Sequence, residues 1–111
     1  MNDKLQIIKI YKKILRDVYE AMINIPRVHY SLKELIIQEM YGYLKDLYLA
    51  NDINDQRVRV IKKEELIIRI KYISSLISTL NDFKVLGEKK YLSVMGNLEL
   101  LLRLMKGWKN I

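Results

Sequence analysis

Residues 66–80 read LIIRIKYISSLISTL, and this stretch decides the fold. Its apolar residues recur at steps of three and four, which places them on one side of a helix: Leu66, Ile70, Ile73, Ile77 and Leu80. No Gly or Pro interrupts the pattern, so it predicts a long amphipathic helix from about Gln56 to Lys84. A helix with one apolar side needs other elements to cover it.

Two segments before this helix show the same spacing. The first ends near Asn24 or Ile25, because Pro26 disfavours helix at the residue before it. Its apolar side consists of Ile8, Tyr11, Leu15, Val18 and Met22. The second begins at Ser31, where Ser31 and Glu34 have the spacing of a capping box. Its apolar side consists of Ile36, Met40, Tyr43, Leu47 and Ala50.

A last segment follows Gly87 and ends near Gly107, with an apolar side at Leu92, Met95, Leu98, Leu102 and Met105. The links between the four segments are short, as in the polar stretch NDIND at residues 51–55. Alternation at Arg57–Ile61 also fits a strand, but no second strand is there to pair with it. The sequence therefore predicts an all-α protein, a single domain over residues 1–111 folded as an antiparallel up-down-up-down four-helix bundle.

The first two predicted helices carry more apolar residues than one core-facing side needs. The second helix has a further row at Ile37, Tyr41, Leu44 and Tyr48, and the first adds Ile7, Ile10 and Ile14. A helix of a monomeric bundle is expected to have a polar back. These seven residues therefore predict an interface in a homo-oligomer, with a wider core side as the alternative interpretation.

The chain is basic, with a net charge of +7 and an isoelectric point near 9.6. Residues 53–111 hold twelve of the twenty Lys and Arg but six of the thirteen Asp and Glu. Clustered cations on rigid helices contact phosphates, so we expect an RNA-binding surface. Its predicted residues are Arg57, Arg59, Lys62, Lys63, Arg69, Lys71, Arg103, Lys106 and Lys109.

Residues of the kind that catalyse reactions are sparse. His29 is the single histidine and there is no cysteine, so we expect no metal site, no cofactor and no enzymatic activity. The arginine-to-histidine spacing of helical ribonucleases is missing, because Arg16 lies too far before His29. Lysines interrupt the N-terminal apolar residues, and no apolar run reaches 18 residues. We expect a cytoplasmic protein without a membrane partner.

Three segments, taken together, resemble the accessory variability determinant (Avd) proteins of diversity-generating retroelements. They are IPRVHYSL at residues 25–32 with the helix ending LYLA at 47–50, Tyr91 opening the last helix, and LLRLMKGW at residues 101–108. Arg103 matches the family's arginine in the fourth helix, and Gly107 with Trp108 matches its terminal Gly-Trp. The chain departs from many relatives at Leu102 and Lys106, where they have Gly, and at Ser78, where they have Arg.

The resemblance covers nearly the whole chain. It implies a non-enzymatic accessory factor that forms homopentamers of four-helix bundles and associates with a reverse transcriptase and its structured template RNA. The family belongs to a wider group of bacterial four-helix proteins that includes those encoded in ribosomal RNA intervening sequences. A protein of that second kind, of unassigned role, is the alternative.

Overall fold

The computed structural model describes residues 3–108, with side chains described from Gln6 onward. Within this range the chain forms four long helices and a short 3-10 turn, without strands. They are α1 (Asp3–Ala21), η1 (Arg27–His29), α2 (Tyr30–Asn51), α3 (Gln56–Asn81) and α4 (Glu88–Lys106). The predicted all-α fold is confirmed, and Arg57–Ile61 is the beginning of α3 rather than a strand.

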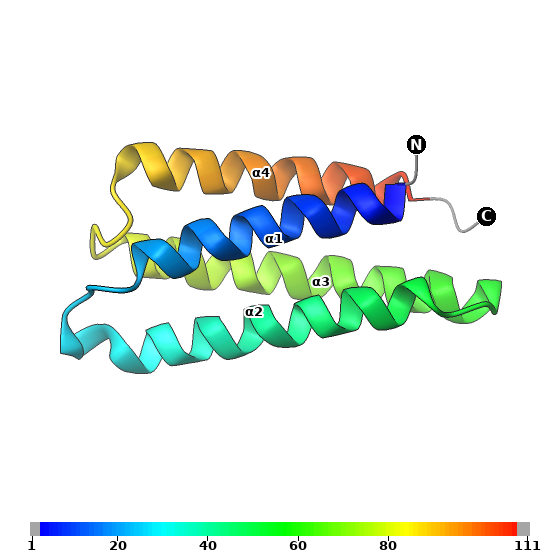
Figure 1. The fold of residues 1–111 in the computed structure, drawn as a ribbon, viewed down its shortest axis with the longest axis horizontal. Coiled ribbons are helices and arrows are strands. Elements are labelled where there is room, and N and C mark those ends of the chain that lie inside the picture. Colours follow the sequence, from blue (N-terminus) through cyan, green and yellow to red (C-terminus); the bar gives the residue numbers. More distant parts are fainter. Residues whose placement is uncertain (1–2, 109–111) are drawn as a thin grey trace.

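The helices form an antiparallel bundle in which consecutive helices run in opposite directions (Figure 1). α1 and α3 each pack against both α2 and α4, so the four helices surround one core. The molecule is elongated, with extents of 45 × 24 × 17 Å. α1 begins and α4 ends at the same end of the bundle, and the hairpin of α2 and α3 extends beyond both of them (Figure 1).

The core contains the predicted apolar sides of α2 and α3, whose ten residues are all buried. The prediction is less accurate for α1 and α4. Leu15 is half-buried, and Leu92 is 62% exposed. On α4, Val94 and Leu101 are buried in the core of the bundle instead. Both helices are apolar on two neighbouring rows, and packing against the other helices decides which row is buried.

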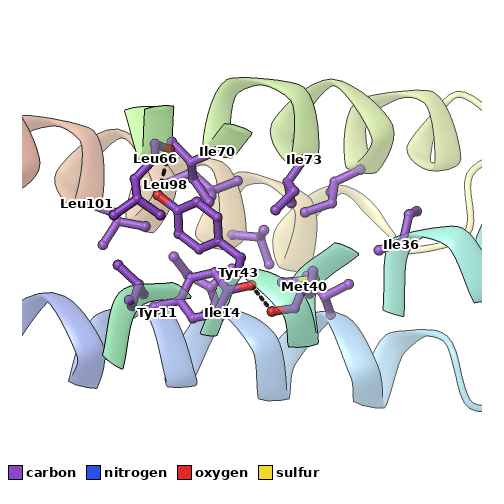
Figure 2. Close-up of a cluster of buried hydrophobic side chains, with 14 of the residues drawn as sticks. Tyr11, Ile14, Ile36, Met40, Tyr43, Leu66, Ile70, Ile73, Leu98 and Leu101 are labelled. Atoms are coloured by element: carbon purple, nitrogen blue, oxygen red, sulfur yellow. Dashed lines mark hydrogen bonds between the residues drawn. The ribbon is translucent and has the colours of Figure 1, made fainter. Parts of the chain in front are cut away.

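Two buried tyrosines tie the helices together (Figure 2). The Tyr11 hydroxyl donates to the Met40 carbonyl oxygen at 2.5 Å, and the Tyr43 hydroxyl donates to the Leu66 carbonyl oxygen at 2.7 Å. The Tyr43 hydroxyl also lies 3.3 Å from the sulfur of Met105 in α4. The two rings are 5.0 Å apart. Because a buried hydroxyl needs a partner, these bonds fix the register of α1 on α2 and of α2 on α3.

The helix ends differ in how they are capped. The predicted capping box of Ser31 and Glu34 is wrong, because η1 runs directly into α2 and His29 is the N-cap, without a side-chain hydrogen bond. At α3 the Asp55 side chain accepts a hydrogen bond from the Arg57 backbone at 2.9 Å. Gly87 precedes α4 with φ of 80°, a conformation that costs glycine little.

Candidate nucleic-acid interface

The antiparallel arrangement brings the first turns of α3 and the last turns of α4 to one end of the molecule (Figure 1). The Lys63 ammonium donates to the Trp108 carbonyl oxygen at 3.3 Å, which links the two segments directly. Six of the nine predicted nucleic-acid-binding residues lie in these turns. We call them the basic end: Arg57, Arg59, Lys62, Lys63, Arg103 and Lys106.

The members of the basic end differ in how open they are. Arg57, Arg103 and Lys106 are exposed, whereas Arg59, Lys62 and Lys63 are half-buried. Lys62 also pairs with Glu65 at 3.2 Å, one turn along the exposed side of α3. The three exposed cations are therefore the most accessible to a phosphate. Arg57 is the second residue of α3, and the hairpin of α2 and α3 extends beyond the other two helices (Figure 1).

The cations of the basic end differ in how they interact with the helix dipoles. Arg103 and Lys106 lie in the last turn of α4, where positive charge stabilises a helix. Arg57 lies in the first turn of α3, where positive charge destabilises a helix, and that turn contains no acidic residue. Asp55 at the N-cap offsets part of this positive potential. The position of Arg57 is thus poor for stability and good for attracting an anion.

Arg69 is not part of this end. Its guanidinium forms ion pairs with Asp46 and, at 3.7 Å, with Glu39, both on α2. It also lies over the Tyr43 ring, 5.6 Å from the ring centre. Because two carboxylates already neutralise it, Arg69 joins α2 to α3 and we remove it from the predicted RNA-binding set.

The two remaining predicted cations lie elsewhere. Lys71 is exposed near the middle of α3, about two helical turns beyond Lys63. Lys109 lies outside the described residues. Sequence spacing alone gave no reason to separate these residues from the basic end, because all of them sit on or near the same two helices.

The predicted oligomer interface is wrong for two residues. Ile7 and Ile14 are 1% and 0% exposed, because the row of α1 on both sides of Tyr11 faces the subunit's own core. Ile10, Ile37 and Leu44 are half-buried and pack against that core as well. Tyr41 and Tyr48 remain open, at 52% and 47% exposed. Five of the seven residues therefore serve the bundle itself.

A larger exposed apolar surface, which was not predicted from the sequence, follows α2 and α3. We call it the α2–α3 apolar row: Leu35, Leu49, Val58, Ile61, Ile68 and Tyr72. Ile61, Ile68 and Tyr72 are spaced by seven and four residues, which is the signal that would have revealed a second apolar side of α3. Ile68 is the most open of the six, at 68%.

The remaining features give no catalytic or metal-binding arrangement to describe. The His29 ring lies against the ring of Phe83 with centres 4.6 Å apart, beside the turn that precedes α2. In the described part of the chain, no group of three or more His, Cys, Asp or Glu side chains is placed to hold a metal ion. Within residues 3–108, no helix is both long and apolar enough to span a membrane.

No family model, curated protein or solved structure matches the chain. Among the features of the molecule itself, the strongest indication of function is the concentration of exposed cations at the basic end.

Proposed function

We propose that the protein is a non-catalytic RNA-binding accessory factor that works as a homo-oligomer. The observation that carries the proposal is the basic end, and above all the exposed Arg57 in the first turn of α3. A cation there weakens the helix, so binding an anion explains its position better than stability does. Phosphates of structured RNA are the partner that such a cluster fits.

The reverse transcriptase of a diversity-generating retroelement is the protein partner that we propose. Its support is the resemblance of residues 25–32 and 101–108 to the Avd family, together with the four-helix fold that this resemblance implies. One departure from the family has a local explanation, since Ser78 accepts a hydrogen bond from the Tyr91 hydroxyl at 3.2 Å. The template RNA would then be the natural ligand of the basic end.

Assembly into a homo-oligomer, a pentamer by the resemblance, is supported by the α2–α3 apolar row. Exposed apolar rows of this length are unusual on a monomer. Multi-angle light scattering at micromolar concentration tests it, and we expect a mass of several subunits. The variant Ile68→Glu with Tyr72→Glu should lower that mass, whereas a monomeric wild-type protein would contradict the proposal.

Binding of RNA is tested by neutralising the exposed cations of the basic end. We expect Arg57→Gln with Arg103→Gln and Lys106→Gln to weaken binding to a structured RNA. The slope of log affinity against log salt should fall by up to about 2.7, since each phosphate contact contributes about 0.9. The matched control removes three equally exposed charges elsewhere, at Lys45, Lys84 and Lys89. Equal loss in both variants would show that net charge alone matters.

Two other functions remain as alternatives. For a protein of the ribosomal intervening-sequence kind, the coding region would lie inside a ribosomal RNA gene. For the proposed function it would lie beside a reverse transcriptase gene and a repeat pair. A small helical enzyme is a third class, and loss of a measurable turnover in His29→Ala would support it. His29 packs against Phe83, which is sufficient to explain its position without catalysis.

A further inference from the structure

α1 carries a second basic surface that the basic end does not include. Lys9, Lys12, Lys13 and Arg16 are all exposed and lie within two turns of the helix. Lys9 with Lys13, and Lys12 with Arg16, are four residues apart, a spacing at which like charges destabilise a helix. Among the described residues, Lys13 pairs with Asp17 at 3.2 Å, while Lys9, Lys12 and Arg16 form no ion pair.

Contacts within the bundle show which neighbour each side of α1 faces. Asp17 lies within 4.0 Å of Lys90, so the Asp17 side of α1 is next to α4. Lys12 is turned about 140° away from Asp17, toward α2, and Arg16 follows it on the outer side of α1. On α2, the side carrying Glu39 and Asp46 is next to α3, because both pair with Arg69. The other side of α2 therefore faces α1.

That other side of α2 carries the exposed tyrosines Tyr41 and Tyr48. The hydrogen bond from Tyr11 to the Met40 carbonyl sets the two helices at one level (Figure 2). With a rise of 1.5 Å per residue, Tyr41 lies about 3 Å from Lys12 along the bundle axis. Tyr41 is therefore level with the turn between Lys9 and Lys12. Because the two helices are antiparallel, Tyr48 lies about 9 Å beyond Lys9 toward the start of α1, and Arg16 lies about 9 Å beyond Tyr41 toward the end of α1. Together the cations and the exposed rings form one elongated strip along the two helices. We call this surface the α1–α2 face.

We propose that the α1–α2 face binds a single-stranded segment of nucleic acid, with its phosphates on Lys9, Lys12 and Arg16 and its bases on Tyr41 and Tyr48. Cations in a row beside open aromatic rings are the usual features of single-strand binding. A double helix would present phosphates to the cations but would keep its bases stacked away from the rings. The proposal rests on the proposed function, since the basic end would hold the structured part of the same RNA.

A second copy of the chain could also bind the α1–α2 face, but the positive charge of this face disfavours it. Lys9 and Lys12 are level with Tyr41 and Arg16 follows along the same strip, so a copy using this face would have to bring acidic side chains against these cations. The α2–α3 apolar row, which lies on the other side of α2, offers a copy more apolar surface. The two faces of α2 therefore suit two different partners.

The test is fluorescence anisotropy with a labelled oligouridylate of about 12 nucleotides and a duplex RNA of the same length. We expect Tyr41→Leu, which keeps an apolar side chain but removes the ring, to weaken oligouridylate binding about 5-fold or more. Its affinity for the duplex should stay within about 2-fold of the wild type, because a duplex keeps its bases stacked away from the ring. Tyr41→Phe should retain binding to both. Because Tyr41 is 52% exposed, these variants leave the core intact.

A second variant, Lys12→Gln with Arg16→Gln, tests whether the cations of the α1–α2 face contact phosphates. We expect the salt slope for oligouridylate to fall by about 1.4, since each single-strand phosphate contact contributes about 0.7. The matched control, Lys84→Gln with Lys89→Gln, removes two exposed charges at the other end of the bundle and should leave the slope unchanged. Wild-type affinity in both Tyr41→Leu and the Lys12 and Arg16 variant would overturn the proposal.

Two further outcomes separate this inference from the proposed function. If Tyr41→Leu lowers the oligomer mass on light scattering and leaves oligouridylate affinity unchanged, the α1–α2 face joins copies of the chain and the inference is wrong. If the basic-end variants lose structured RNA while the α1–α2 variants bind like the wild type, the proposed function stands and the inference fails. A wild-type protein that binds neither RNA would contradict both.

Discussion

α3 contains two parts that can be compared directly, because they belong to one continuous helix. From Leu66 to Leu80, every third or fourth residue is buried against the other helices. From Gln56 to Lys63, no side chain is fully buried, and Val58 and Ile61 are open beside Arg57. The first part has the pattern of a core helix, while the second has cations and apolar residues on the outside. The difference supports the proposal that the first turns of α3 bind a partner.

The same contrast holds for single arginines on α3. Arg69, in the buried part, pairs with Asp46 and Glu39 and covers Tyr43. Arg57, in the first turn, is exposed and opposes the helix dipole. Two arginines that look alike in the sequence thus have different surroundings, and variants of each part should respond differently.

The largest expected effect is on the buried part. Ile73→Ala removes a fully buried side chain, and we expect it to lower the free energy of unfolding by about 2–5 kcal/mol. Its control, Val60→Ala, alters an exposed side chain of the same helix outside the α2–α3 apolar row and should change stability by less than about 0.5 kcal/mol. Urea unfolding followed by circular dichroism measures both. Similar losses in the two variants would mean that the two sides of α3 are not distinguished as described.

Alkaline pH should destabilise the folded protein because two tyrosine side chains are buried in its core. Burial raises the pKa of Tyr11 and of Tyr43, whose hydroxyl donates to the Leu66 carbonyl. Above about pH 10 the unfolded chain releases these protons and the folded chain keeps them, so stability is complete below pH 10 and falls above it. The expected slope is about 1.4 kcal/mol per tyrosine per pH unit.

The control for this slope is Tyr11→Phe, measured by unfolding at several pH values above 10. Removing one of the two buried phenols should make the alkaline loss of stability about half as steep. An unchanged slope in Tyr11→Phe would show that the alkaline loss comes from other groups, such as the many lysines.

A smaller effect is expected at Arg69. Arg69→Gln breaks the ion pairs with Asp46 and Glu39, whose side chains are about a third exposed. Because solvent weakens such pairs, we expect a loss of about 0.5–1 kcal/mol. The affinity for structured RNA should be unchanged, measured by anisotropy beside the Arg57, Arg103 and Lys106 variant. A clear loss of RNA binding in folded Arg69→Gln would return this residue to the interface.

The fold was predictable from the sequence because the core-facing residues of α2 and α3 form unbroken apolar rows. Each of these helices has a continuous row at steps of three and four, and every residue of both rows is buried. α1 has apolar residues spread over about 160° of its circumference, at Ile7, Ile8, Ile10, Tyr11, Ile14 and Leu15. Which of them faces inward depends on the position of α4, so Ile7 and Ile14 were wrongly predicted to lie at an interface.

The candidate site was only partly predictable for a similar reason. The sequence shows that cations are concentrated after residue 53, but not which of them carboxylates on α2 neutralise. Asp46 and Arg69 are 23 residues apart, so their pairing depends on the packing of two helices. The cations of α1 escaped notice because acidic residues of the same segment lower its net charge. Asp17, one of those acids, is buried and pairs with Lys13.

The most direct measurement compares stability and RNA affinity in one variant, Arg57→Glu. A carboxylate in the first turn of α3 favours the helix dipole, so we expect the free energy of unfolding to rise by up to about 1 kcal/mol. The affinity for structured RNA should fall, since a cation of the basic end becomes an anion. Opposite changes in the two quantities would support a binding role for the first turns of α3. Lower stability with unchanged RNA affinity would contradict it.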